Sequence, residues 1–67
     1  MDIQVRFGKR VRELRINKKW SQEKLASVAN IDRTYVFSIE KGERNVSIKM
    51  IDKIASALEI EIIELLK

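Results

Sequence analysis

One spacing occurs three times in this sequence and constrains the fold more than any other feature. Each copy consists of an apolar residue, a Ser or Asp, three further residues and a second apolar residue. The copies are Trp20–Ser21 with Leu25, Ile31–Asp32 with Val36, and Val46–Ser47 with Ile51. Ser and Asp side chains accept hydrogen bonds from the free N–H groups that begin a helix, and the apolar pair clamps the first turn. The pattern therefore predicts helices that start near residues 22, 33 and 48.

Further helices are predicted at both ends of the chain. A first helix from about Asp2 to Asn17 is indicated by apolar residues that step by four, four and three positions. These residues are Ile3, Phe7, Val11 and Leu14. A weaker copy of the repeated spacing, Ile60–Glu61 with Leu65, predicts a fifth, short helix. Asn30 and Gly42 tolerate the left-handed conformation and are expected to end the second and third helices.

Composition supports one small all-α domain that spans residues 1–67. The chain has no proline, no cysteine and no histidine, so it offers no disulfide and no ordinary zinc site, and we expect no cofactor. No apolar run approaches the ~18 residues of a membrane span, and the N-terminus lacks the apolar block of a secretory signal. We therefore expect a cytoplasmic protein that does not contact a membrane.

Charge is distributed unevenly along the chain. Residues 1–49 carry 12 Lys and Arg against 6 Asp and Glu, a net charge of +6, whereas residues 50–67 carry 2 against 4, a net charge of −2. The basic part favours a polyanion as partner and the last part does not. A merely solubilising surface is the alternative.

The connection between the second and third predicted helices is only about three residues long, Ala29 to Ile31. Two short helices joined so tightly must cross steeply, which is the arrangement of a helix-turn-helix motif. Apolar residues occupy the positions where this motif needs contacts: Leu25, Ala26, Ala29, Ile31, Val36 and Ile39. Ala26 matters most, because the two helices approach closely there. A generic pair of amphipathic helices is the alternative.

The third helix has an inward face, defined by Val36 and Ile39, and a polar outward face. At about 100° per residue the outward face consists of Thr34, Ser38 and Lys41, with Arg33 and Phe37 on one flank. Arg can bond guanine O6 and N7 together, and Thr can offer its hydroxyl to a base edge and its methyl to thymine.

We therefore predict that Arg33, Thr34 and Ser38 read bases in a DNA major groove, with a solvated polar face as the alternative. Phe37 is the fourth candidate for base reading, and it either packs on its neighbours or lines the groove against a thymine methyl or a sugar.

Phosphate contacts are expected on both sides of these residues. Ser21 and Gln22, with the N–H groups of the second helix, form a site that favours an anion. The opposite side of the groove would be contacted by residues in and after the loop that follows the third helix. These residues are Arg44, Asn45, Ser47 and Lys49. Such contacts fix register more than they read sequence, and plain surface charge is the alternative for each Lys and Arg.

Glu40 lies about 40° from Val36 around the third helix, so it should be partly buried. A buried carboxylate needs a partner, and Arg15 at the end of the first helix is the candidate. The pair would join the first helix to the third. The alternative is that both side chains simply reach water.

The segment from Ile60 to Leu66 has more apolar residues than one short helix can bury. We predict that the surplus forms a dimer interface made by Ile60, Ile62, Ile63, Leu65 and Leu66. DNA readers of this kind commonly bind as two-fold dimers whose reading helices lie one duplex turn apart, ~34 Å. Packing of the whole segment within the monomer is the alternative.

Four blocks of the sequence, in order, resemble the phage-repressor and Cro-like helix-turn-helix family. They are "FGKRVRELR", "WSQEKLA", "NIDRTYVFSIEKGERN" and "KIASALEIEIIELL". The resemblance covers nearly the whole chain and implies a five-helix, lambda-repressor-like DNA-binding fold. It also implies a phosphate contact for Gln22, base contacts for Arg33, Thr34 and Ser38, and a structural ion pair of Arg15 with Glu40.

Within that family, "DRTY" and "GERNVS" are particularly similar to the controller proteins of restriction-modification systems, which are small dimeric regulators of transcription. Three positions depart from the family pattern. Asn30 and Glu59 stand where glycine is usual. The left-handed tolerance of Asn permits the first change, and the second implies a tighter or strained corner between the last two helices. Phe37 stands where a small or polar residue is common, which leaves the operator preference open.

The resemblance therefore predicts a sequence-specific, homodimeric transcription regulator that binds a roughly palindromic operator in duplex DNA. A phage-type repressor, an antitoxin-like regulator or a protein-interaction module is the alternative. An enzyme is not expected, because the chain has no His, no Cys and no phosphate-binding Gly-rich loop. Activation would need a surface for RNA polymerase, for which Glu23 or Glu43 could serve. The operator sequence and the direction of regulation do not follow from the sequence.

Overall fold

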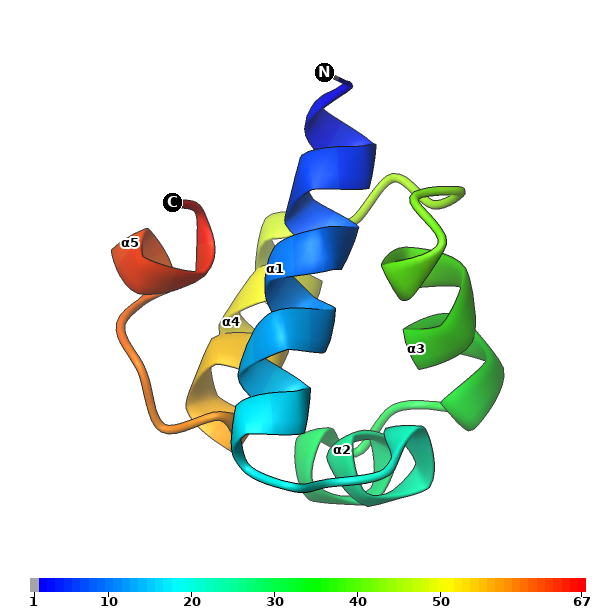
Figure 1. Ribbon diagram of the computed structural model, residues 1–67, viewed down its shortest axis with the longest axis vertical. Helices are drawn as coiled ribbons and strands as arrows, with labels where there is room; N and C mark the ends of the chain where they lie inside the picture. The colour runs from blue at the N-terminus through cyan, green and yellow to red at the C-terminus, as the bar shows by residue number, and fades with distance from the viewer. Residues whose placement is uncertain (1) are drawn as a thin grey trace.

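A computed structural model describes residues 2–67, and this part of the chain contains five α-helices, as predicted. They are α1 (Ile3–Asn17), α2 (Gln22–Ala29), α3 (Arg33–Glu40), α4 (Ile48–Ala57) and α5 (Ile62–Leu65). α1 runs through the middle of the molecule, with α3 on one side and α5 on the other (Figure 1). α4 lies behind α1, and α2 crosses at the end of α1 away from the N-terminus.

Four of the five helices begin at a side-chain cap, which explains why they start where the sequence predicts. The carboxylates of Asp2 and Asp32 accept from the N–H groups of Gln4 at 2.7 Å and Thr34 at 2.8 Å. The hydroxyls of Ser21 and Ser47 accept from the N–H groups of Lys24 at 3.0 Å and Met50 at 3.1 Å. Glu61 precedes α5 without such a bond. The apolar partners of the three repeated spacings all pack in or against the core.

Left-handed residues end the helices where the sequence predicts. Asn30 has φ 59° and Gly42 has φ 77°. Glu59 takes φ 59° at the corner between α4 and α5, where a tighter or strained corner was expected. Lys19, at φ 62°, was not anticipated. The connection from α2 to α3 comprises residues 30–32, three residues as predicted but one position later. Within it the N–H of Ile31 donates to the carbonyl of Ala26 at 2.9 Å.

The core lies where α1, α2, α3 and α4 meet, and α5 packs on one side of it against α1 and α4 (Figure 1). Its largest fully buried side chains are Leu25, Ile39, Ile54, Leu58, Leu65, Val11 and Val36. The backbones of α1 and α3 touch at Gly8, because a Cβ there would lie 2.1 Å from the carbonyl oxygen of Ile39. Ile3, predicted to share the inward face of α1, is exposed because this end of the helix extends beyond the core.

Candidate nucleic-acid interface

The first turn of α3 projects polar side chains into solvent beside the start of α2. Arg33, Thr34 and Phe37 are exposed. Together with Gln22 from α2, these three side chains line one shallow hollow. Ser38, on the same outward side, is half-buried. The structure thus brings the four predicted base-reading residues, Arg33, Thr34, Phe37 and Ser38, onto one helix next to the N-terminus of another.

Asp32 orients the Thr34 side chain. The Thr34 hydroxyl donates to the Asp32 carboxylate at 2.7 Å, and the same oxygen accepts from the Thr34 N–H at 2.8 Å. These two bonds, with a smaller contribution from the charge of Arg33, lower the pKa of Asp32 below its ordinary value of 3.8. Because the hydroxyl proton is engaged, Thr34 offers an acceptor and a methyl group to a ligand in this arrangement.

Arg33 is partnered only loosely. Its Nη1 lies 3.3 Å from Oε2 of Glu23, and both side chains are more than half exposed. An ion pair of this kind contributes little to stability in water. The guanidinium can therefore leave Glu23 at low cost and turn toward a ligand. This pair was not predicted from the sequence, because it joins residues ten positions apart on two different helices.

Glu40 connects the interface to the interior. Its carboxylate accepts from Arg15 Nε at 2.6 Å and Nη2 at 3.0 Å, and from Gln22 Nε2 at 3.1 Å. The Glu40 side chain is 4% exposed and that of Arg15 is 11% exposed. The hydrogen bond to Glu40 raises the pKa of Arg15 above its ordinary value, although burial opposes the shift. Arg15 and Glu40 therefore form the pair that the sequence indicated, and this pair also positions Gln22.

The predicted phosphate-binding residues occupy two separate places. Ser21 and Gln22 stand at the N-terminus of α2, while the other group lies in and after the loop between α3 and α4. In that loop, the Arg44 guanidinium lies 4.1 Å from the ring centre of Tyr35. The Asn45 side-chain oxygen accepts from Nε2 of Gln4. Sequence reasoning missed Gln4 and Tyr35, because neither contact is local in the chain.

Beyond the loop, Ser47 caps α4 through its acceptor lone pair, so its hydroxyl proton stays available to a ligand. Lys49 is exposed and takes part in none of the ion pairs found among residues 2–67. Both residues follow the loop of Arg44 and Asn45, so the four polar side chains are contributed by one continuous stretch.

The structure corrects the predicted dimer interface. Leu65 is fully buried in the monomer, and Ile60 packs partly buried against the core, because α5 needs an inward side to dock. Ile62, Ile63 and Leu66 are exposed. The apolar outer face of α5 is therefore defined as Ile62, Ile63 and Leu66, whereas Leu65, predicted to face a second copy, faces the core instead.

Among residues 2–67, no helix combines the length and the apolarity needed to cross a membrane. The same residues contain no cluster of three side chains suited to bind a metal ion.

Known proteins share both the sequence and this arrangement. Residues 11–65 match the family described as "Helix-turn-helix". Control protein C.BamHI from Bacillus amyloliquefaciens is 46% identical over 61 residues, which cover 90% of this chain and 75% of the relative. The crystal structure of the restriction-modification controller protein C.AhdI from Aeromonas hydrophila superimposes with a TM-score of 0.91 at 53% identity, covering 92% of this chain and 94% of that one. The chain belongs to the helix-turn-helix controller proteins.

A further controller protein has been solved with DNA. C.Esp1396I bound to a 25 base pair operator site matches with a TM-score of 0.88 at 32% identity and covers 98% of this chain and 91% of that one. The family, the fold and the regulator class predicted from the sequence are thereby confirmed, and the matched controllers are regulators rather than enzymes.

Proposed function

We propose that this controller protein binds operator DNA as a homodimer, with α3 in the major groove, and so regulates transcription in a restriction-modification system. The observation that carries the proposal is the exposed N-terminal half of α3. Exposed Arg33, Thr34 and Phe37 surround one hollow with Gln22 at the start of α2. An exposed helix start with such side chains fits a major groove. The operator complex of the relative C.Esp1396I supports the same role.

Each side chain at the hollow has a distinct role in this proposal. Arg33 leaves Glu23 and bonds guanine O6 and N7. Thr34 accepts from a base amino group or places its methyl against a thymine methyl, while Ser38 bonds the edge of a neighbouring base pair. Phe37, 51% exposed, supplies the apolar contact to a thymine methyl or a sugar.

The phosphates on the two sides of the groove are bound by different parts of the chain. Gln22, held by Glu40, has a second amide proton for a phosphate, and Ser21 adds its hydroxyl at the same helix N-terminus. Residues of the α3–α4 loop and the start of α4 contact the other strand: Arg44, Asn45, Ser47 and Lys49. These contacts position α3 without reading sequence.

The second copy of the chain is proposed to meet the first at the outer face of α5. Residues 1–67 thus form a single DNA-binding domain that ends in a dimerisation helix. This end of the chain is net negative and suits a position away from phosphate. To bind successive turns of a palindromic operator, the two α3 helices of such a dimer would have to lie about 34 Å apart.

RNA polymerase is the further proposed partner where the protein activates a promoter. The exposed carboxylates of Glu23 and Glu43 are the candidates for this contact; in the free protein they pair with Arg33 and Lys41. Because Arg33 turns to DNA in the complex, Glu23 would become available there. The proposed setting is the bacterial cytoplasm, on nucleoid DNA.

The proposal is tested by selecting binding sites from random duplex DNA at two salt concentrations. We expect a two-fold symmetric consensus with half-sites about one turn apart and a steep loss of affinity with salt. The matched control is Lys53→Ala, because Lys53 is exposed on α4 and has no proposed DNA contact. Failure to enrich any sequence would refute the base-reading role. In that case the outer face of α5 would be tested as the docking site of another protein.

A further inference from the structure

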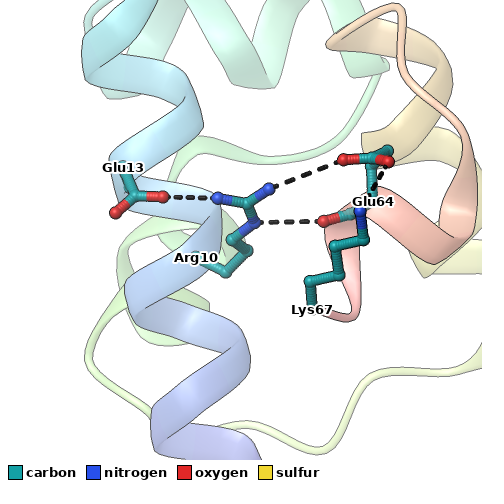
Figure 2. A network of polar contacts seen from close by, with 4 residues as sticks. All are labelled: Arg10, Glu13, Glu64 and Lys67. Carbon is teal, nitrogen blue, oxygen red and sulfur yellow. Dashed lines mark hydrogen bonds and ion pairs between the residues drawn. The ribbon is translucent and has the colours of Figure 1, made fainter.

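Arg10 connects α1 to the end of α5 (Figure 2). Its Nε donates to the backbone carbonyl oxygen of Glu64 at 3.0 Å, and its Nη2 lies 3.9 Å from the carboxylate of the same residue. Its Nη1 pairs with Glu13 on α1, and the Lys67 ammonium donates to Glu64 at 3.0 Å. One guanidinium therefore contacts both the main chain and the side chain of α5.

A helix as short as α5 depends on such contacts. Its four residues cannot maintain a helix alone in water, because nucleation costs more than so few hydrogen bonds contribute. The last carbonyl groups of a helix also lack partners within it. Arg10 provides a charge-assisted bond to one of them and places a positive charge at the negative end of the helix dipole. Leu65, fully buried, anchors the opposite side of α5 in the core.

These two attachments set the rotation of α5 about its axis. Taking Leu65 as the inward direction and about 100° per residue, Ile62 lies about 60° away, Leu66 about 100° and Ile63 about 160°. Their exposed fractions follow the same order, 38%, 45% and 68%. Rotation of α5 by one residue would turn one of these side chains inward and break up the apolar face.

We infer that Arg10 is a positioning residue for dimerisation, because it holds α5 in the rotation at which its outer face can meet a second copy. The inference rests on the proposed homodimer. The Arg10 side chain is one quarter exposed, so salt reaches its contacts with Glu64. Dimerisation through an apolar face should therefore weaken as sodium chloride is added, which an apolar contact alone would not do.

The test is the dimer dissociation constant of the full chain, measured by sedimentation equilibrium. Arg10→Gln should raise it about tenfold, which corresponds to ~1.4 kcal/mol. Arg10→Lys should recover part of the loss, since one ammonium can reach the Glu64 carbonyl but cannot also bridge to the carboxylate. Glu13→Gln is the matched control, because it changes the same network without touching α5, and should alter the constant by less than about twofold.

Hydrogen exchange separates positioning from general destabilisation. The amides of Leu65 and Leu66 donate within α5, to Glu61 and Ile62. They should exchange faster in monomeric Arg10→Gln, while the amides of α2 and α3 exchange as in the parent. Faster exchange spread evenly over all helices would overturn the inference, and so would an unchanged dissociation constant.

Measurements on the unsubstituted protein test the inference and the proposed homodimer separately. If Arg10→Gln does not fold, the parent is measured between about 0.05 and 0.5 M sodium chloride, and a constant that does not rise with salt overturns the inference. A parent that stays monomeric at every concentration refutes the proposed homodimer itself. If Arg10→Gln dimerises with the same dissociation constant as the parent, only the role of Arg10 is refuted.

Discussion

α3 and α5 are both short helices that dock on α1, yet they present opposite chemistry to the solvent. They lie on opposite sides of α1 (Figure 1) and both pack against it. The outward side of α3 carries a guanidinium and hydroxyl groups, whereas that of α5 carries three aliphatic side chains. A similar way of docking thus produces two surfaces of different chemistry. The inward residues hold each helix in place, and the outward residues are the ones proposed to bind different partners.

The two helices also differ in how firmly they are attached. α3 buries Val36 and Ile39, and its Glu40 forms an almost fully buried ion pair with Arg15 of α1. α5 has one fully buried side chain, Leu65, and the partly exposed contacts of Arg10. The proposed role of α3 in reading base pairs requires a rigid support that keeps its side chains in register. The attachment of α5 is weaker than that of α3, and dissolved salt can screen its partly exposed ionic contacts.

The largest effect is expected at the attachment of α3. Arg15→Met would leave the Glu40 carboxylate buried without its charged partner and should lower the free energy of unfolding by about 4 kcal/mol. Urea unfolding followed by Trp20 fluorescence measures this loss. Arg12→Met, at an exposed position of the same helix, is the control and should have little effect. A loss below about 1 kcal/mol would mean that water replaces the pair, and that α3 is no more firmly attached than α5.

The next largest effect separates the two sides of α5. Leu65→Ala should lower the free energy of unfolding by about 3 kcal/mol, because it empties a fully buried position. Ile63→Ala, on the exposed side, should leave the stability of the monomer nearly unchanged and weaken dimerisation. Urea unfolding of dilute protein and sedimentation equilibrium measure the two effects. Equal losses of stability in both variants would contradict the assignment of inward and outward sides.

A smaller effect is expected on the outward side of α3. Arg33→Ala should cost ~1–3 kcal/mol of DNA binding and relax specificity at one base pair, with little change in stability. Lys49→Ala is the comparison, because loss of a phosphate contact should weaken all sequences alike and reduce the salt slope by about 1. Competition binding with single-base operator variants distinguishes the two. If Arg33→Ala kept the base preference of the parent, the base-reading role would be withdrawn.

The smallest effect concerns the cap of α3 and its dependence on pH. Thr34 contacts lower the pKa of Asp32 below 3.8, so the carboxylate is more readily ionised in the folded state. Its contribution to stability is fully present above pH 3.8 and is lost as the pH falls through the lower folded pKa. Asp32→Asn should therefore show a shallower loss of stability in that window, as measured by thermal unfolding across the acid range. If the stability of Asp32→Asn fell with pH as steeply as that of the parent, Asp32 would be excluded as a source of the pH dependence.

The helices could be predicted from the sequence because the residues that start and end each helix lie within one or two turns of it in the chain. Ser21, Asp32 and Ser47 cap the helices that they were predicted to begin, and Asn30 and Gly42 end helices as left-handed residues. The Arg15–Glu40 contact was also predicted from the sequence, because a carboxylate near the buried side of a helix requires a partner. The candidate DNA-facing residues were placed on one face by helical periodicity alone, and the geometry brings them together.

Other features depended on contacts between residues far apart in the chain. The sequence predicted a surplus of apolar residues after Ile60, but only docking on α1 and α4 decided that Leu65 would be buried. The close approach at Gly8, the bond from Gln22 to Glu40 and the attachment of α5 by Arg10 arise in the same way. Local spacing determines where helices begin, where they end and which face is apolar, because these depend on neighbouring residues. Which of those residues is buried, and which charge meets which partner, is decided by how the helices pack in three dimensions.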